Sequence, residues 1–171
     1  MIKFAKVRDV KSPARGTEKS AGIDFFVPSM DEKFCDDLFN ANKKRINKEY
    51  VFVHKTIILN PQEKIVIPSG IKVNFDNIVT MALVAHNKSG VGANKGLSFL
   101  AHVVDQDYQG EIFISLVNNS NKPQYIEQGD KIIQFLLMPV FFPELEEVSE
   151  KELYLETSQR GNGALGSTGS K

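Results

Sequence analysis

Short apolar runs separated by turn residues constrain the fold of this chain more than any other feature of its sequence. The runs are rich in Val, Ile and Phe, and turns such as Asn60-Pro61 and Gln128-Gly129-Asp130 separate them. This spacing predicts an all-β barrel or jelly roll. The predicted strands span residues 2–7, 23–27, 51–59, 64–68, 71–74, 78–85, 97–104, 111–118, 124–126 and 132–141.

Two segments depart from the strand pattern. Residues 28–50 are polar and charged, but Phe34, Leu38 and Phe39 have helical spacing, which predicts a helical or irregular insertion. Residues 158–171 contain several glycines and no hydrophobic periodicity, which predicts a flexible arm. We therefore predict one β domain over residues 1–157, with an insertion at 28–50, followed by the arm at 158–171.

The composition excludes several classes of protein. Lys+Arg and Asp+Glu are both 21, so the formal net charge is zero and no basic field attracts nucleic acid. Residues 1–10 lack the apolar core of a signal peptide, and no run approaches the roughly 20 apolar residues of a membrane span. The single cysteine, Cys35, is typical of a reducing compartment. These features predict a soluble cytoplasmic protein with no stable nucleic-acid partner and no membrane partner.

The segment from His102 to Glu111 is the strongest candidate for chemistry. His102 and Val103 lead through an apolar run to Asp105, and a turn then presents Tyr108 before a new strand begins. A carboxylate held by a rigid hairpin can act as a general base on water. A ring just beyond the turn can form the wall against which a flat or sugar-like substrate lies.

Polar residues at three other strand ends have the chemistry of a phosphate site. Lys88-Ser89-Gly90 offers a cation, a hydroxyl and backbone donors, Asp24 stands at a strand start, and Gln134 lies among apolar residues. Each also has a structural interpretation, as a turn, a capping aspartate or a hydrogen-bonded core amide. The three histidines lack the spacing of metal ligands and are interpreted as structural: His54, His86 and His102.

The arm contains a partial phosphate-binding pattern. Residues 161–168 have the spacing of a P-loop, but Ser167 stands where that motif needs lysine, and this argues against a P-loop nucleotidase. Arg160, Ser167 and Thr168 are nevertheless suitable donors to phosphate oxygens. A solvated tail is the alternative interpretation of this segment.

Taken in order, these five segments resemble the motifs of the trimeric dUTPase family over residues 11–168, apart from the insertion. The resemblance implies a β jelly roll, a homotrimer whose active sites use all three chains, and an arm that closes over the nucleotide. It also implies Mg²⁺-assisted hydrolysis of dUTP to dUMP and pyrophosphate, which limits the incorporation of uracil into DNA.

The resemblance also implies roles for individual residues. Asp105 would activate the water that attacks the α-phosphorus, and Tyr108 would pack on the deoxyribose and exclude a 2′-hydroxyl. Ser89 would stabilise charge on the leaving pyrophosphate, Gln134 would hold the phosphate and water network, and Asp24 would bind Mg²⁺ through water. The remaining implied substrate contacts are Lys88, Gly90, His102, Val103, Arg160, Leu165, Gly166, Ser167 and Thr168.

Several positions depart from the family pattern and leave alternatives open. Lysine stands at position 88 in place of arginine, Leu165 in place of phenylalanine, and Leu100 and His102 in place of small residues. One alternative is therefore a deoxynucleotide pyrophosphatase for a different or modified pyrimidine. A dCTP deaminase-like enzyme is disfavoured, because residues 112–117 contain no glutamate. A third alternative is a regulatory protein that binds a partner through the insertion, although a solvated surface insertion is the simpler interpretation.

Overall fold

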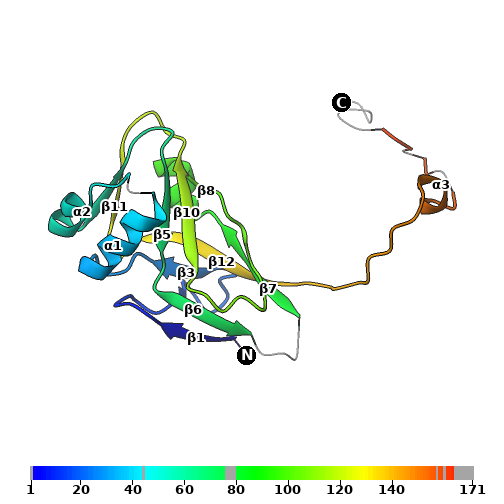
Figure 1. Cartoon of the computed structure of the whole chain (residues 1–171), viewed down its shortest axis with the longest axis horizontal. Helices are drawn as coiled ribbons and strands as arrows, with labels where there is room; N and C mark the ends of the chain where they lie inside the picture. The colour runs from blue at the N-terminus through cyan, green and yellow to red at the C-terminus, as the bar shows by residue number, and fades with distance from the viewer. Residues whose placement is uncertain (1, 44, 76–79, 157, 160, 164–171) are drawn as a thin grey trace. The chain divides into compact units, whose positions relative to one another are not determined.

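The computed structural model describes residues 2–43, 45–75, 80–156, 158–159 and 161–163. The chain divides into two compact units, Met1–Val140 and Phe141–Lys171. All strands of the described part of the chain belong to the first unit (Figure 1). Only residues 158–159 and 161–163 of the predicted arm are described. Its five proposed contact residues all lie outside the described residues: Arg160, Leu165, Gly166, Ser167 and Thr168.

The first unit is an all-β jelly roll, as the sequence predicts. Its largest sheet has the order β2-β3-β12-β7-β9, a second has the order β5-β10-β8, and β1-β6 and β11-β4 form two pairs. Every pairing is antiparallel. The strands are β1 Ile2–Lys6, β2 Ala14–Arg15, β3 Ile23–Phe26, β4 Thr56–Leu59, β5 Lys64–Pro68, β6 Ile71–Phe75, β7 Met81–His86, β8 Leu97–Phe99, β9 Val103–Val104, β10 Phe113–Asn118, β11 Gln124–Glu127 and β12 Lys131–Pro139.

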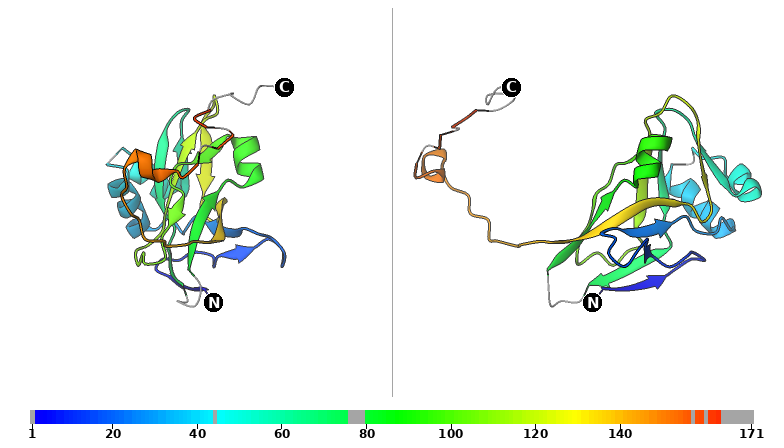
Figure 2. Two further views of the ribbon diagram at one scale, coloured as in Figure 1. Left: turned by 90° about the vertical axis from the view of Figure 1, so that its right-hand side faces the viewer. Right: turned by 180° about the vertical axis from the view of Figure 1, so that it is seen from behind.

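The core follows from the two-residue period of these strands. In β6, Ile71, Val73 and Phe75 are buried, whereas Lys72 and Asn74 face outward. At the centre of the largest sheet, Phe135 of β12 packs on Phe25 of β3, with 4.7 Å between the ring centroids. Figure 2 shows β12 between β3 and β7, so these three strands form a rigid platform.

Two predicted strands have the wrong extent. The first half of the predicted strand at 51–59 belongs to helix α2, Lys48–His54, because Asn47 caps its first turn through the amide N–H of Tyr50 and Lys55 ends it in the left-handed conformation. The predicted strand at 97–104 is two strands, β8 and β9. Leu100 lies between them, where the chain bends.

The insertion forms helix α1, Glu32–Ala41, followed by α2, and it belongs to the core. Asp31 caps α1 by accepting the N–H of Phe34 at 2.7 Å. Phe34, Cys35 and Leu38 are fully buried in the main hydrophobic cluster. The prediction of a helix in this segment is therefore confirmed. The interpretation of the segment as a solvated surface insertion is wrong, because one face of α1 is apolar and packs on the sheet.

The insertion is also hydrogen-bonded to a sheet. The Asn42 side chain donates to the carbonyl of Val66 at 2.8 Å and accepts the N–H of Val66 at 2.9 Å. Val66 lies on β5, the outer strand of the order β5-β10-β8. The amide of Asn42 thus occupies backbone groups of β5 that a further strand would use.

The described residues of the second unit include a short helix, α3, Glu150–Leu153. Ser149 and Glu152 form a capping box, and these hydrogen bonds from Ser149 lower the pKa of Glu152. Large apolar side chains of this unit are exposed: Phe141, Phe142, Leu145, Leu153, Tyr154 and Leu155. Among the described residues of either unit, no helix has the length and apolar character needed to cross a membrane.

Candidate functional site

A buried carboxylate with two lysine partners forms the centre of one candidate group. Asp24 on β3 is 4% exposed. The Nζ of Lys88 lies 2.5 Å from its Oδ1, and the Nζ of Lys131 lies 3.4 Å from its Oδ2. A buried charge is stable only when it is paired, so these lysines explain how Asp24 remains inside the sheet. Asp24 is therefore a buried, paired carboxylate and not only a turn residue at the start of a strand.

Gln134 lies beside Asp24 and contacts a glycine that sequence reasoning did not single out. In the register of the sheet Gln134 pairs with Asp24 on one side and His86 on the other. Its Nε2 donates to the carbonyl of Asn87 at 2.9 Å. A β-carbon at Gly22 would lie 2.1 Å from the Oε1 of Gln134, so only glycine leaves room for this amide.

Gly22→Ala is expected to lower turnover about 10- to 100-fold, because the added methyl group displaces the Gln134 amide and a small misplacement is costly in a polar site. Gly16→Ala is the matched control, since its β-carbon meets nothing nearer than the Ser20 Oγ at 3.5 Å. Steady-state rates of the activity that the sequence resemblance implies, measured together with melting temperatures, distinguish the two variants. Unchanged turnover in Gly22→Ala would remove Gln134 from the site.

The segment after β7 presents Lys88, Ser89 and Gly90 at the start of a π-helical turn, Gly90–Asn94. Ser89 and Gly90 are exposed, and the N–H of Gly92 donates to the carbonyl of Lys88 at 2.8 Å. Beside this turn lies a hollow of about 180 Å³, whose lining includes Lys88, Lys95, Lys131 and Asp130. Lys88 and Lys131 are paired with Asp24, and Lys95 is paired with Asp130, so an anion such as phosphate would compete with these carboxylates for the lysines.

The second candidate group lies in the hairpin of β8 and β10, whose long connecting segment carries β9 and Asp105. The strands on either side of the Asp105 turn, β9 and β10, belong to different sheets and do not pair with each other. Strand β9 pairs with β7, and the turn that follows closes through a hydrogen bond from the N–H of Tyr108 to the carbonyl of Asp105 at 3.2 Å. The Oε1 of Gln106 accepts the N–H of Met81 at 3.1 Å, which ties the turn to the first residue of β7. Asp105 is exposed on this fixed turn, as a general base requires.

The ring of Tyr108 has a defined position in this hairpin. Its hydroxyl donates to the carbonyl of Glu111 at 2.8 Å, and a β-carbon at Gly110 would lie 2.3 Å from the hydroxyl oxygen. The ring therefore folds over Gly110, where only glycine fits. Tyr108 remains 41% exposed, so part of its surface is available to a ligand.

The approach to the hairpin is aromatic. The ring of His102 packs edge-to-face on Phe99 at 4.5 Å between centroids, and the carbonyl of His102 accepts the N–H of Ala85 at 2.6 Å. Leu100 and Val103 are exposed nearby. The rings of Phe99 and His102 give this edge of the hairpin a bulk that small residues would not.

The two groups lie toward opposite ends of β7. Gln134 pairs with His86 at the last residue of β7, whereas Val104 pairs with Leu83, so Asp105 follows toward the first residue. At about 3.3 Å per residue, the groups are separated by about 13 Å along the strand. The structure therefore brings together Asp24, Lys88 and Gln134, and separately Asp105 and Tyr108.

The described residues offer no protein-only metal site. No group of three or more His, Cys, Asp or Glu side chains is placed to hold an ion within this part of the chain. Asp24 is already paired with Lys88 and Lys131. One carboxylate of this kind can accept hydrogen bonds from the waters of a bound cation, but it does not hold the ion by itself. Burial raises the pKa of Cys35, which argues against a nucleophilic thiolate.

Residues 51–169 match the dUTPase family, a range that includes Lys88, Asp105, Tyr108 and Gln134 but not Asp24. This chain belongs to the dUTPase family. Deoxyuridine 5′-triphosphate nucleotidohydrolase of Wolbachia pipientis subsp. Culex pipiens (strain wPip) is 35% identical over 122 residues, 70% of this chain and 77% of the relative. The corresponding protein of Wolbachia sp. subsp. Brugia malayi (strain TRS) is 30% identical over 169 residues, 98% of this chain and 90% of that protein.

Solved dUTPase structures share the fold of this chain. A mutant dUTPase of Staphylococcus bacteriophage 80alpha with dUpNHpp superposes with a TM-score of 0.73 at 21% identity, covering 99% of this chain and 98% of that one. The native EIAV dUTPase gives a TM-score of 0.60 at 16% identity, covering 90% and 100%. At these identities the likeness establishes the jelly-roll fold.

Proposed function

We propose that this protein hydrolyses dUTP to dUMP and pyrophosphate, by attack of water on the α-phosphorus, and so limits the incorporation of uracil into DNA. The observation that carries the proposal is the hairpin of a dUTPase-family chain in which Asp105 is exposed directly before the fixed ring of Tyr108. One hairpin thus holds a candidate base and a candidate sugar wall at neighbouring positions.

In the proposed reaction Asp105 accepts a proton from the attacking water. The bond from the water oxygen to the α-phosphorus forms as the bond to the bridging oxygen breaks, and the electron pair leaves with pyrophosphate. Ser89 and Lys88 stabilise the charge that develops on the phosphates. Lys88 is paired with Asp24 in the free chain, and Lys131 is close enough to balance Asp24 when Lys88 contacts phosphate.

The sugar and the metal ion have separate roles in this scheme. Tyr108 packs on the deoxyribose and leaves no room for a 2′-hydroxyl, while the main chain at Gly90, His102 and Val103 contributes further contacts. Gln134 holds the phosphate and water network. Mg²⁺, when bound with the triphosphate, neutralises phosphate charge, and Asp24 accepts hydrogen bonds from its waters.

A homotrimer with shared sites would unite the two groups of residues. The separation of about 13 Å along β7 keeps Asp105 away from Lys88 and Gln134 within one chain. The large exposed apolar side chains of the second unit, such as Phe141 and Leu145, also need a surface to cover them. These two features support assembly in which different chains complete each site of a soluble cytoplasmic enzyme.

We assign the closing arm to residues 158–171, after the β domain of residues 1–157, with Arg160, Ser167 and Thr168 over the β- and γ-phosphates and with Leu165 and Gly166 over the base. A chain ending at residue 159 is expected to keep its melting temperature and to lose about 100-fold or more in kcat/KM, because closure alone is lost. Thermal unfolding and steady-state kinetics of both chain lengths test this. Aggregation of the shorter chain would make the arm structural.

A second candidate function is hydrolysis of a different or modified pyrimidine deoxynucleotide. Leu100 and His102 favour it, since they stand where the family resemblance places small residues beside the base, and the ring of His102 is held against Phe99.

Pyrophosphate release with Mg²⁺ from dUTP, dTTP, dCTP, 5-modified deoxyuridine triphosphates and UTP decides between the two candidates. Selectivity for dUTP supports the proposed function, and selectivity for another deoxynucleotide supports the second candidate. No turnover of any of these substrates would contradict both and favour a regulatory protein.

A further inference from the structure

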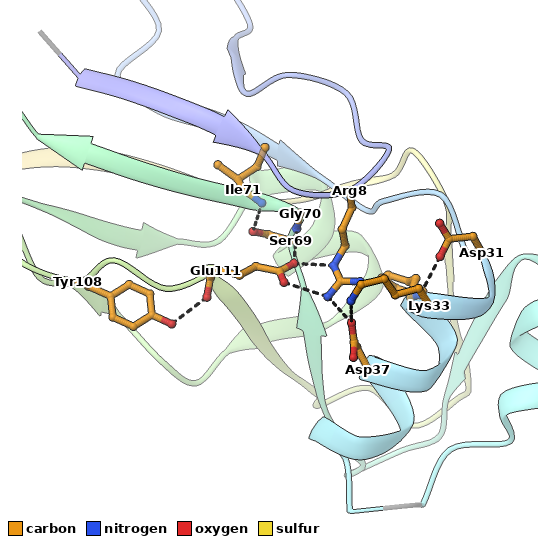
Figure 3. Close-up of polar contacts among 10 residues, drawn as sticks. Arg8, Asp31, Lys33, Asp37, Ser69, Gly70, Ile71, Tyr108 and Glu111 are labelled. Atoms are coloured by element: carbon orange, nitrogen blue, oxygen red, sulfur yellow. Dashed lines mark hydrogen bonds and ion pairs between the residues drawn. The ribbon is translucent and has the colours of Figure 1, made fainter.

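An ion-pair network centred on the buried side chain of Arg8 connects the Tyr108 hairpin to the insertion. Figure 3 shows Arg8 between two carboxylates, Glu111 after the hairpin and Asp37 on helix α1. Arg8 is 103 positions from Glu111 and 29 from Asp37 in sequence, so only the fold brings the three together. Arg8, Asp37 and Glu111 are not among the residues proposed above for catalysis or substrate binding.

The contact between Arg8 and Glu111 fixes the glutamate in two directions. The Nε and Nη2 of Arg8 donate to the two carboxylate oxygens of Glu111 at 2.7 and 2.9 Å, and the N–H of Gly70 donates to Oε1 at 2.7 Å. The side chains of Arg8 and Glu111 are only 8% and 13% exposed. A two-pronged, largely buried pair of this kind specifies orientation as well as distance.

Helix α1 contributes the second carboxylate. The Nη2 of Arg8 donates to Oδ2 of Asp37 at 2.7 Å, and the Nζ of Lys33, one turn earlier on the helix, contacts the same oxygen at 2.8 Å. Hydrogen bonds to Glu111 and then to Asp37 raise the pKa of Arg8, and hydrogen bonds from Lys33 and Arg8 lower the pKa of Asp37. Both shifts favour the charged forms of Arg8 and Asp37.

Glu111 transmits the position of this network to the tyrosine. Its carbonyl accepts the Tyr108 hydroxyl at 2.8 Å, and the ring folds over Gly110 with no space for a β-carbon between them. The position of the ring thus depends on where the main chain at Glu111 lies. That main chain is held by the carboxylate contacts to Arg8 and Gly70.

We propose that Arg8 is a positioning residue for Tyr108 and that Asp37, on the insertion, holds the Arg8 guanidinium in place. The insertion thereby takes part in discrimination between deoxyribose and ribose. The inference rests on the proposed function, in which Tyr108 is the wall against the sugar. A network with a purely structural role would affect stability and leave sugar discrimination unchanged.

The test compares Arg8→Lys with wild type in the ratio of kcat/KM for dUTP to kcat/KM for UTP. Lysine keeps the charge but not the two-pronged contact, so the ratio is expected to fall about tenfold as the ring shifts. Asp37→Asn leaves the contact to Glu111 in place and is expected to lower the ratio about threefold. If Arg8→Lys does not fold, the ratio measured for Asp37→Asn tests the inference by itself.

The matched control is Lys48→Gln. This change removes the ion pair between Lys48 on α2 and Asp36, which lies next to Asp37 on α1 but outside the network of Arg8. It is expected to leave the ratio unchanged. A ratio equal to wild type in Arg8→Lys and Asp37→Asn, with lowered melting temperatures, would overturn the inference alone. A wild-type protein that does not discriminate between dUTP and UTP would contradict the proposed role of Tyr108 and the inference with it.

Discussion

Asp105→Asn is expected to lower kcat on dUTP by about 10²- to 10⁴-fold while leaving nucleotide affinity nearly unchanged. The amide keeps the size of the side chain and its place after β9 but cannot accept the proton of the attacking water. Single-turnover hydrolysis and calorimetric binding of a non-hydrolysable dUTP analogue measure the two quantities separately. Asp107→Asn is the control, because Asp107 is an exposed carboxylate in the same turn.

Mixing two inactive variants tests whether chains share the site. Asp105→Asn and Lys88→Ala each remove one of the two groups that lie toward opposite ends of β7. After joint refolding, mixed trimers regain sites that carry an intact Asp105 from one chain and an intact Lys88 from another. Recovery of activity supports shared sites. Activity that stays at the level of the separate variants would place both residues of each site in one chain.

Phe34→Ala is expected to lower the free energy of unfolding by about 3–5 kcal/mol, because a fully buried ring is replaced by a cavity. Denaturant unfolding at a fixed protein concentration measures it, since assembly makes the apparent stability depend on concentration. Phe52→Ala is the matched control. Phe52 lies on α2, 44% of it is exposed, and its loss should cost much less.

A loss of this size in Phe34→Ala would show that the insertion is part of the folded core of the domain. Removal of residues 30–48 would also remove Phe34, Cys35 and Leu38 from the core and is expected to unfold the chain. A Phe34→Ala variant with wild-type stability would show instead that the helix packs only loosely in solution.

Local patterns in the sequence predicted much of this fold. Short runs rich in Val, Ile and Phe between turns predicted strands such as β5 and β6, and the spacing of Phe34 and Leu38 predicted α1. Residues 51–54 were harder, since Val51, Phe52 and Val53 have strand propensity. The caps at Asn47 and Lys55 outweigh it. Burial of the α1 face could not be predicted, because it depends on which sheet the helix meets.

The sequence suggested candidate site residues but not their arrangement. Asp105 and Tyr108 are close in sequence, so a turn between strands was enough to place them together. The separation of this hairpin from Asp24 and Gln134 is set by strand register, which the sequence does not encode locally. The contact of Gly22 with Gln134 and that of Arg8 with Glu111 likewise join distant segments.

The paired hydrogen bonds of Asn42 with Val66 have a consequence for aggregation and for sequence change. An outer strand with free backbone groups is a template for pairing with another molecule, and a side-chain amide at that point blocks the template. A relative that lost this insertion would expose β5. It would therefore need a charge, a proline or another covering segment there to stay soluble.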